Sequence, residues 1–316
     1  MLQKKYTRYE SGRSQKMSRF FRLGGVALLG GLMIALWFDD RLVTTTSLVV
    51  LVGGAGIAVL GGLFDDFRPL HWSWQLLLQL LLGGLLLSVG MNIDRIHLGD
   101  GYLIDLSLWP GLSLLGTLVW VLIVMNALNW VDGVDGLMGG VMMVVYFTLF
   151  LLSLRPEVNQ PTLALLTIML LGATLAFSLF NWFPATIIAG TSGATFMGFV
   201  VAALSLYAGA KVATALLVLS IPILDAGAVI ISRFLHGQSP FLPDKKHFHH
   251  VLVELGWSSR QIAVFYTLLT GGMALLALAT HFLEKLTVFL VVAAVFFGGM
   301  ILIRRHLQDY HSTPQE

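Results

Sequence analysis

Apolar residues in this chain gather in runs close to the length that a helix needs to cross a bilayer, about 20 residues. We predict ten such runs, at residues 23–38, 46–64, 72–91, 110–128, 137–154, 161–180, 192–208, 212–232, 261–282 and 286–303. The segments between them are mostly short, and the longest are residues 92–108 and 233–260. The pattern therefore predicts an all-α polytopic membrane protein with about ten transmembrane helices.

Composition supports this fold class. Of the 316 residues, 57% are hydrophobic and 11% are charged, whereas about a quarter of the residues in soluble proteins are charged. The bilayer is thus the expected partner, and a net charge of +2 gives no reason to expect a nucleic acid. The chain has no cysteine, which excludes disulfides and thiolate metal sites.

The distribution of Lys and Arg predicts an orientation. If the N-terminus is cytoplasmic and ten spans alternate, the inner segments hold all but five of the 19 Lys and Arg residues. The outer five are Arg41, Arg95, Arg155, Lys211 and Lys285. This asymmetry favours an N-in, C-in topology in the inner membrane.

The same topology divides the chain into parts. Residues 1–22 form a basic cytoplasmic arm without the apolar core of a cleavable signal peptide. Residues 23–304 form the transmembrane domain, and residues 305–316 a cytoplasmic tail. Residues 92–108 surround a Gly-Asp-Gly turn and are expected to form a small periplasmic hairpin.

One stretch, Asn126 to Leu137, interrupts the apolar pattern with two amides and two carboxylates, in the sequence N-A-L-N-W-V-D-G-V-D-G-L. Asp132 and Asp135 are three residues apart and would face the same way on a helical turn. Gly133 and the glycine after Asp135 leave space for a bulky anionic ligand near the backbone. A polar cap at the membrane edge is the alternative, although a cap needs one such residue rather than four.

Other polar clusters lie between the predicted spans. The paired carboxylates Asp65 and Asp66 follow the second span, and Asp225 lies within the eighth. Two further clusters are the segment Asn181 to Gly193 and the run Asp244-Lys245-Lys246-His247-Phe248-His249-His250. Glycines and hydroxyls in the first could cradle phosphate or serve close helix packing, and the spacing leaves both open.

The predicted topology places the clusters that flank the spans on the cytoplasmic face. A transporter would instead hold its ionisable residues near the bilayer midplane, so the pattern favours chemistry at one interface. Carboxylate and amide oxygens suit Mg²⁺, whose coordination is often completed by substrate phosphates. The parts fit a lipid phosphate attacking a nucleotide diphosphate at the inner leaflet.

Four motifs in order extend this interpretation: R-L-G-G-V-A-L, G-L-F-D-D, the segment ending N-A-L-N-W-V-D-G-V-D-G-L, and D-K-K-H-F-H-H-V-L-V-E-L-G. Together they resemble the polyprenyl-phosphate N-acetylhexosamine-1-phosphate transferases of the glycosyltransferase family 4 type, to which the lipid I synthase is related. The D-x-x-H-x-H-H form is similar to the undecaprenyl-phosphate GlcNAc-1-phosphate transferase branch. The resemblance covers most of the chain, from about Arg22 to Gly256.

The resemblance implies transfer of a sugar-1-phosphate from a UDP-sugar to polyprenyl phosphate with release of UMP, the first membrane step of cell-envelope polysaccharide synthesis. It implies Mg²⁺, with Mn²⁺ as an alternative, and leaves a homodimer open. The implied catalytic residues are Asp65, Asp66, Asp132 and His249. The implied substrate-binding residues are Asp135, Asn181, Lys246, His247 and His250. The implied metal ligands are Asp66, Asn129 and Asp132.

The chain departs from the family pattern in three places. Thr191 replaces an aspartate that is a metal ligand in the family, Gln75 replaces a common lysine, and the usual span before the basic arm is absent. Because a hydroxyl is a weaker Mg²⁺ ligand than a carboxylate, Thr191 leaves a catalytically impaired relative as an alternative. A lipid or ion transporter is the other alternative. The reaction is expected to be a single displacement, with a phospho-aspartyl route as its competitor.

Overall fold

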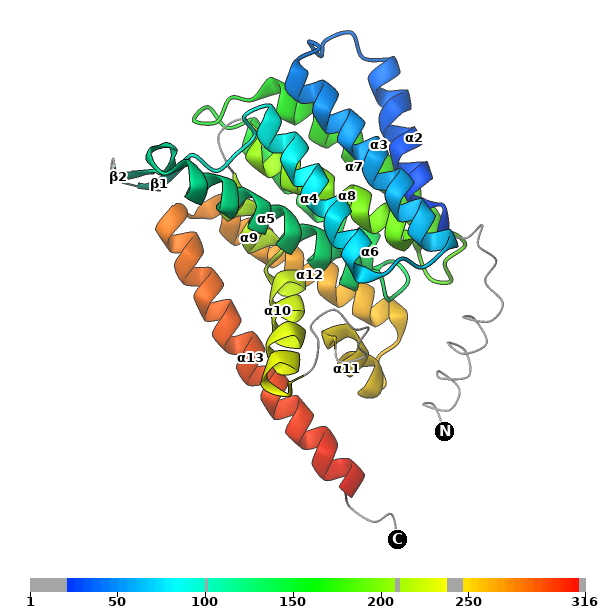
Figure 1. Ribbon diagram of the computed structural model, residues 1–316. Helices are drawn as coiled ribbons and strands as arrows, with labels where there is room; N and C mark the ends of the chain where they lie inside the picture. Colours follow the sequence, from blue (N-terminus) through cyan, green and yellow to red (C-terminus); the bar gives the residue numbers. More distant parts are fainter. Residues whose placement is uncertain (1–21, 100–101, 208–210, 238–246, 313–316) are drawn as a thin grey trace.

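The computed structural model describes residues 22–99, 102–207, 211–237 and 247–312, and in these ranges the chain is helical except for one hairpin (Figure 1). The basic arm therefore lies almost wholly outside the described residues. The elements are α2 (Gly24–Trp37), α3 (Thr46–Phe67), α4 (Trp72–Ser88), β1 (Arg95–Gly99), β2 (Tyr102–Asp105), a 3₁₀ turn η2 (Leu106–Leu108), α5 (Pro110–Val131), α6 (Leu137–Ser153), α7 (Pro161–Asn181), α8 (Gly190–Leu206), α9 (Val212–Val218), α10 (Ser220–Leu235), α11 (Phe248–Glu254), α12 (Ser259–Ala279) and α13 (Phe282–Ser312).

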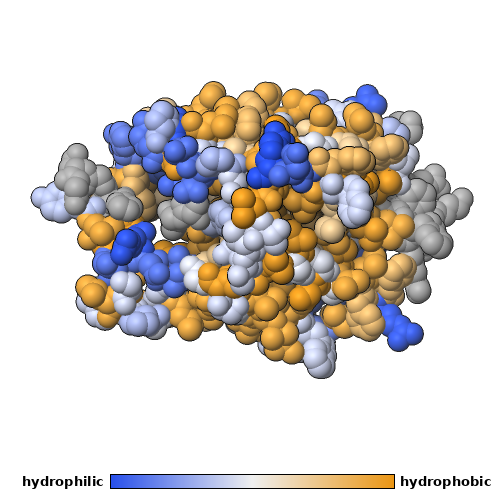
Figure 2. Space-filling model, turned by 90° about the horizontal axis from the view of Figure 1, so that it is seen from above, coloured by the Kyte–Doolittle hydropathy of each residue, from blue (hydrophilic) through white to orange (hydrophobic). Residues whose placement is uncertain are grey.

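Several of these helices can cross a membrane. Among the described residues, five helices are long and apolar enough, namely α3, α5, α7, α12 and most of α13. The pair α9 and α10 makes a sixth if it is counted as one broken span, and α2, α4, α6 and α8 are shorter apolar helices. The surface seen in Figure 2 is largely hydrophobic, and large apolar side chains such as Leu268 and Val295 are exposed. The chain is a multi-pass helical membrane protein.

The continuous span predicted at residues 212–232 is wrong. The structure breaks it at Leu219 into α9 and α10, whose axes are bent by 76°. Pro222 explains the break, because its ring clashes with the carbonyl four residues earlier and it donates no hydrogen bond. Val218, four residues before Pro222, is the last residue of α9.

The predicted hairpin is confirmed. β1 and β2 pair antiparallel, with Arg95 opposite Asp105. The backbone N–H of Ile93 donates to Thr117 Oγ1 at 3.0 Å, and Ser113 Oγ donates to Asp94 at 2.8 Å. These bonds fix the hairpin to the first turns of α5.

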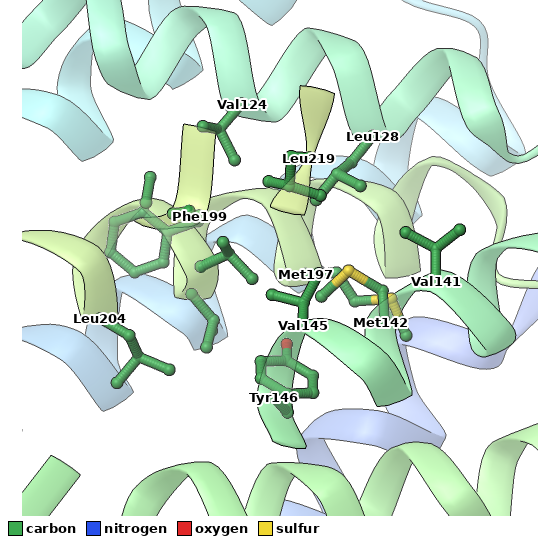
Figure 3. Packing of buried hydrophobic residues seen from close by; sticks show 14 of the residues in the cluster. Val124, Leu128, Val141, Met142, Val145, Tyr146, Met197, Phe199, Leu204 and Leu219 are labelled. Carbon is green, nitrogen blue, oxygen red and sulfur yellow. The ribbon is translucent and has the colours of Figure 1, made fainter. Parts of the chain in front are cut away.

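Helix α8 is the centre of the bundle, since every residue from Ser192 to Leu206 is buried. It packs between α2, α3 and α5. Small residues permit this contact: the ring of Phe199 occupies the space beside Gly54, and the backbone of Met125 lies against Gly198. Figure 3 shows the core that α8 shares with α5 and α6. A rigid central helix of this kind fixes the position of whatever contacts its first turn.

Candidate active site

The first turn of α8 is where carboxylates from distant segments meet. The N–H groups of Thr191 and Ser192 each donate to one oxygen of Asp66, both at 3.0 Å. The N–H of Gly190 donates to Asp132 Oδ2 at 2.7 Å. Since the N-terminus of a helix carries unpaired N–H groups and a partial positive charge, it stabilises these anions.

Glycines hold this helix end against its neighbours. A Cβ at Gly24 or Gly25 on α2, or at Gly62 on α3, would collide with the backbone of residues 188–193. The N–H of Gly24 also donates to Ile188 O at 3.1 Å. The backbone that receives Asp66 and Asp132 is thus in direct contact with two helices.

Asp65 points to a different set of donors. Its Oδ1 accepts from the Leu70 N–H at 2.7 Å and from Gln75 Nε2 at 3.0 Å. Its Oδ2 accepts from the Thr191 hydroxyl at 2.8 Å. The two residues that depart from the family pattern, Gln75 and Thr191, are therefore both hydrogen-bond donors to this carboxylate.

A small pocket opens beside Asp65. Its lining includes Gln75, Gln79, Asn129 and Thr191. Behind it, Asn126 Nδ2 donates to Gln79 Oε1 at 2.8 Å, which ties α5 to α4. Asn129 thus lies in the Asp65 pocket, whereas Asp66 and Asp132, its predicted partners in metal binding, meet at the α8 N-terminus.

Asp132 carries an electrostatic cost. Burial and the negative charge of Asp66 together raise the pKa of this carboxyl to about 7, against the opposing effect of the hydrogen bond from Gly190. The guanidinium of Arg22 lies 3.7 Å from Asp66 and is half exposed, so it compensates only part of the negative charge. The repulsion between the two carboxylates can be relieved by protonation of Asp132 or by a bound cation.

Asp135 and Asn181 join the two loops that carry the site. Asp135 Oδ2 accepts from the Ala185 N–H at 3.0 Å. Asn181 accepts from the Gly136 N–H at 3.1 Å and donates to Ile187 O at 3.0 Å. Gly136 has a left-handed backbone (φ 78°), which glycine adopts without strain. In the structure both predicted substrate-binding residues hold loop backbone, and their contact with substrate stays a prediction.

The histidine segment is anchored by a residue that the sequence did not assign to the site. Asp225 of α10 lies 3.2 Å from His247 Nδ1 and accepts from the Phe248 N–H at 2.7 Å. The signal was present, because an ionisable residue within an apolar span usually has a specific partner. Asp225 therefore orients the start of α11.

His249 lies against the acidic loop at Gly133. Its ring is buried, neither ring nitrogen has a hydrogen-bond partner in the described residues, and a side chain at Gly133 would collide with its Nε2. The ring of His250 packs on it with centroids 4.2 Å apart. Burial and the neighbouring imidazoles hold the pKa of His249 well below its usual range, so the ring is neutral at pH 7. Lys246 lies outside the described residues.

The carboxylates Asp66 and Asp132 could hold a metal ion only together with ligands from outside the protein. Within the described ranges no three His, Asp or Glu side chains form a ready-made cation site. Two carboxylates, Asp66 and Asp132, repel each other at one helix end. Mg²⁺ in phosphoryl-transfer sites commonly uses one or two carboxylates and takes its other ligands from water and substrate phosphates. The residues therefore fit a cation that arrives with a diphosphate rather than a closed protein site.

Comparison with known sequences decides the family. Residues 48–209, from the first turns of α3 to the end of α8, match the profile of glycosyl transferase family 4. The chain belongs to glycosyl transferase family 4. The matched region contains Asp65, Asp66 and Asp132.

Relatives of this family 4 protein are similar over most of its length. It is 28% identical over 290 residues to a protein of Bacillus subtilis (strain 168) named "Probable undecaprenyl-phosphate N-acetylglucosaminyl 1-phosphate transferase", covering 87% of this chain and 76% of that one. It is 29% identical over 324 residues to the decaprenyl-phosphate N-acetylglucosaminephosphotransferase of Mycobacterium tuberculosis (strain ATCC 25618 / H37Rv), covering 92% and 80%. It is 28% identical over 301 residues to the undecaprenyl-phosphate alpha-N-acetylglucosaminyl 1-phosphate transferase of Escherichia coli (strain K12), covering 90% and 79%.

Proposed function

We propose that this chain transfers N-acetylhexosamine-1-phosphate from a UDP-sugar to polyprenyl phosphate and releases UMP. The observation that carries the proposal is the convergence of Asp66 and Asp132 on the N–H groups of Gly190 to Ser192, with His249 packed against Gly133 beside them. The names of the relatives supply the polyprenyl phosphate and the N-acetylglucosamine phosphate. In its relatives' setting, such a reaction would begin a cell-envelope polysaccharide.

The proposal includes a topology. Ten spans with both termini inside, in the inner membrane, would bring the site to the cytoplasm, where UDP-sugars are made. The distribution of Lys and Arg supports this orientation. The five long helices, the bent pair and the four shorter apolar helices together supply enough apolar segments for ten spans. The domain limits proposed from the sequence, 23–304 for the transferase and 305–316 for a tail, belong to the same scheme.

In the proposed step, an oxygen of the lipid phosphate attacks the β-phosphorus of the UDP-sugar. A new P–O bond forms to the lipid, and the bond from the β-phosphorus to the bridging oxygen breaks, so UMP leaves with the electron pair. Single displacement is favoured by the environment of Asp65. Its two oxygens accept three hydrogen bonds, from Leu70, Gln75 and Thr191, and these would have to break before it could attack phosphorus.

The remaining residues have positioning and charge roles. When bound, Mg²⁺ would neutralise diphosphate charge, and Asp66 and Asp132 are the side chains that would hold it. Neutral His249 can donate one hydrogen bond to a phosphate oxygen without prior loss of a partner. Asp225 keeps His247 oriented toward the same region.

A single assay tests the proposal. Purified protein in detergent is given radiolabelled UDP-N-acetylhexosamines and decaprenyl phosphate, with and without Mg²⁺, and UMP and labelled lipid are measured. We expect equal amounts of both products, their loss in Asp132→Asn, and their retention in Asp40→Asn, which removes an exposed carboxyl. Exchange of label between UMP and the UDP-sugar without lipid would instead indicate a phospho-aspartyl intermediate.

The competing functions give different results in the same preparation. A non-catalytic relative would bind the UDP-sugar without releasing UMP. A transporter would move lipid or ions across liposomes without forming product. Either outcome would overturn the transferase assignment.

A further inference from the structure

A second cavity lies where β1, α9 and α13 meet, with a volume of about 280 Å³. Three cationic side chains line it, Arg95, Lys211 and Lys285. The remaining lining residues are apolar and include Ile93, Leu216 and Phe282. A cavity that combines cations with an apolar wall suits an anion that carries a hydrocarbon chain.

This cavity is remote from the candidate active site. Ile93, part of its lining, donates its N–H to Thr117 at 3.0 Å. From Thr117 to Asp132 the chain advances fifteen residues along α5, which is about 22 Å of helix at 1.5 Å per residue. A ligand in this cavity would not contact the carboxylates at the α8 N-terminus.

The cations here lack sufficient negative partners. Arg95 is 3.8 Å from Asp105, a long and exposed ion pair. Lys285 donates to the carbonyl of Thr280 at 2.6 Å, and near it, within the described ranges, the positive charges of Arg155 and Lys211 face only one negative charge, that of the exposed Glu284. The ammonium of Lys211 has no hydrogen-bond or ion-pair partner among the described residues, and burial lowers its pKa. Half-buried like charges are unfavourable without an anion.

The position of Lys285 along the membrane helix α13 points to a lipid. The spanning part of α13 begins at Phe282, so Lys285 lies in its first turn, at the edge of the apolar layer. By the predicted orientation this is the outer side, where Lys and Arg are scarce. Three of the five outer cations nevertheless line this one cavity.

We infer that this cavity binds the phosphate of an anionic phospholipid, with Lys211 and Lys285 against the phosphate and an acyl chain along Phe282 and Leu286. The apolar wall favours a lipid over a soluble phosphate, because it would otherwise face water. Phospholipid of the surrounding bilayer is the abundant source of such a group. The site does not depend on the proposed transferase activity.

The test measures thermal stability of the purified full chain in detergent during titration with phosphatidylglycerol or phosphatidylcholine. We expect phosphatidylglycerol to stabilise the wild type at lower concentration than phosphatidylcholine. Each cation near an anionic lipid surface strengthens binding about fivefold, so Lys211→Gln with Lys285→Gln should weaken phosphatidylglycerol binding about 25-fold. Arg41→Gln is the matched control, because it removes an outer cation that does not line the cavity.

A second variant guards against misfolding of the first. Ala213→Phe would fill the cavity while keeping its cations, and it should also abolish the preference for phosphatidylglycerol. Equal effects of the two lipids on the wild type, or a preference that survives both variants, would overturn the proposal. Full competition by soluble glycerol phosphate, or tighter binding of decaprenyl phosphate than of phosphatidylglycerol, would overturn the phospholipid assignment.

Discussion

Replacing Thr191 by aspartate restores the acid of the family pattern. The added negative charge should make the stability of the folded protein depend more strongly on bound Mg²⁺. The Thr191 hydroxyl lies 2.8 Å from Asp65 Oδ2, so a carboxylate there would lie about 3–4 Å from that of Asp65. Two unit charges 4 Å apart repel by about 4 kcal/mol at an effective dielectric constant near 20. Protonation of one carboxyl would relieve part of this, so the loss of stability without a cation should be below that value.

The assay is thermal unfolding in detergent against Mg²⁺ concentration, with UMP release measured in parallel. Thr191→Asp should melt below the wild type in chelator and gain more stability from Mg²⁺. The Mg²⁺ concentration for half-maximal UMP release should fall about tenfold, equivalent to ~1.4 kcal/mol of the repulsion being relieved. Thr191→Asn is the control, since it has similar shape without charge. If the two variants respond equally to Mg²⁺, Thr191 does not face the cation site and the reasoning fails.

Three further substitutions test other parts of the site. Asp132→Asn should lower UMP release at least about 1,000-fold. Because the pKa of Asp132 in the folded protein is raised to about 7, the wild-type free energy of unfolding in chelator should fall by up to ~1.4 kcal/mol per pH unit from about pH 4 to 7 and then level off. Asp132→Asn should remove this pH dependence of stability. A wild-type stability that rises over this range would contradict the burial of a charged Asp132. Gly133→Ala should displace the His249 ring and reduce UMP release more than its effect on melting temperature explains. Gly172→Ala, in the middle of α7 with open space around it, should leave UMP release unchanged and should not lower the melting temperature. Asp225→Asn should lower UMP release about tenfold and shift its pH profile, and an unchanged profile would leave Asp225 a purely structural role.

Much of the site could be predicted from chain pattern because its carboxylates follow apolar helices directly. The N-A-L-N-W-V-D-G-V-D-G-L stretch and the Asp65-Asp66 pair are helix ends, and helix ends of one length gather at one side of a bundle. The finer geometry could not be predicted. Asp132 and Asp135 were expected to face the same way, and the structure sends them to separate N–H groups, those of Gly190 and Ala185. Which N–H group each carboxylate meets depends on how α8 packs, and the spacing of residues along the chain does not determine that packing.

The contact between Asp225 and His247 was missed for a related reason. The two residues are 22 positions apart, and each has a separate interpretation at the level of sequence, Asp225 as a buried acid in a span and His247 as part of a histidine cluster. The break at Leu219 changes the direction of α10. Pro222, which causes the break, is evident in the sequence, but the new direction of α10 is not. Tertiary packing, rather than composition, decides which acid orients which imidazole.

The glycine contacts around the start of α8 also limit how the protein can respond to substrate. No side chains separate Gly24, Gly25 or Gly62 from the facing backbone. The first turn of α8, which binds the carboxylates, therefore cannot rotate or slide without a backbone collision. If the site adjusts to sugars of different size, the histidine segment is then the part that moves. Its helix α11 has only seven residues and is held through Asp225. Donor selectivity in this protein should accordingly vary with changes around α11 and stay constant with changes around α8.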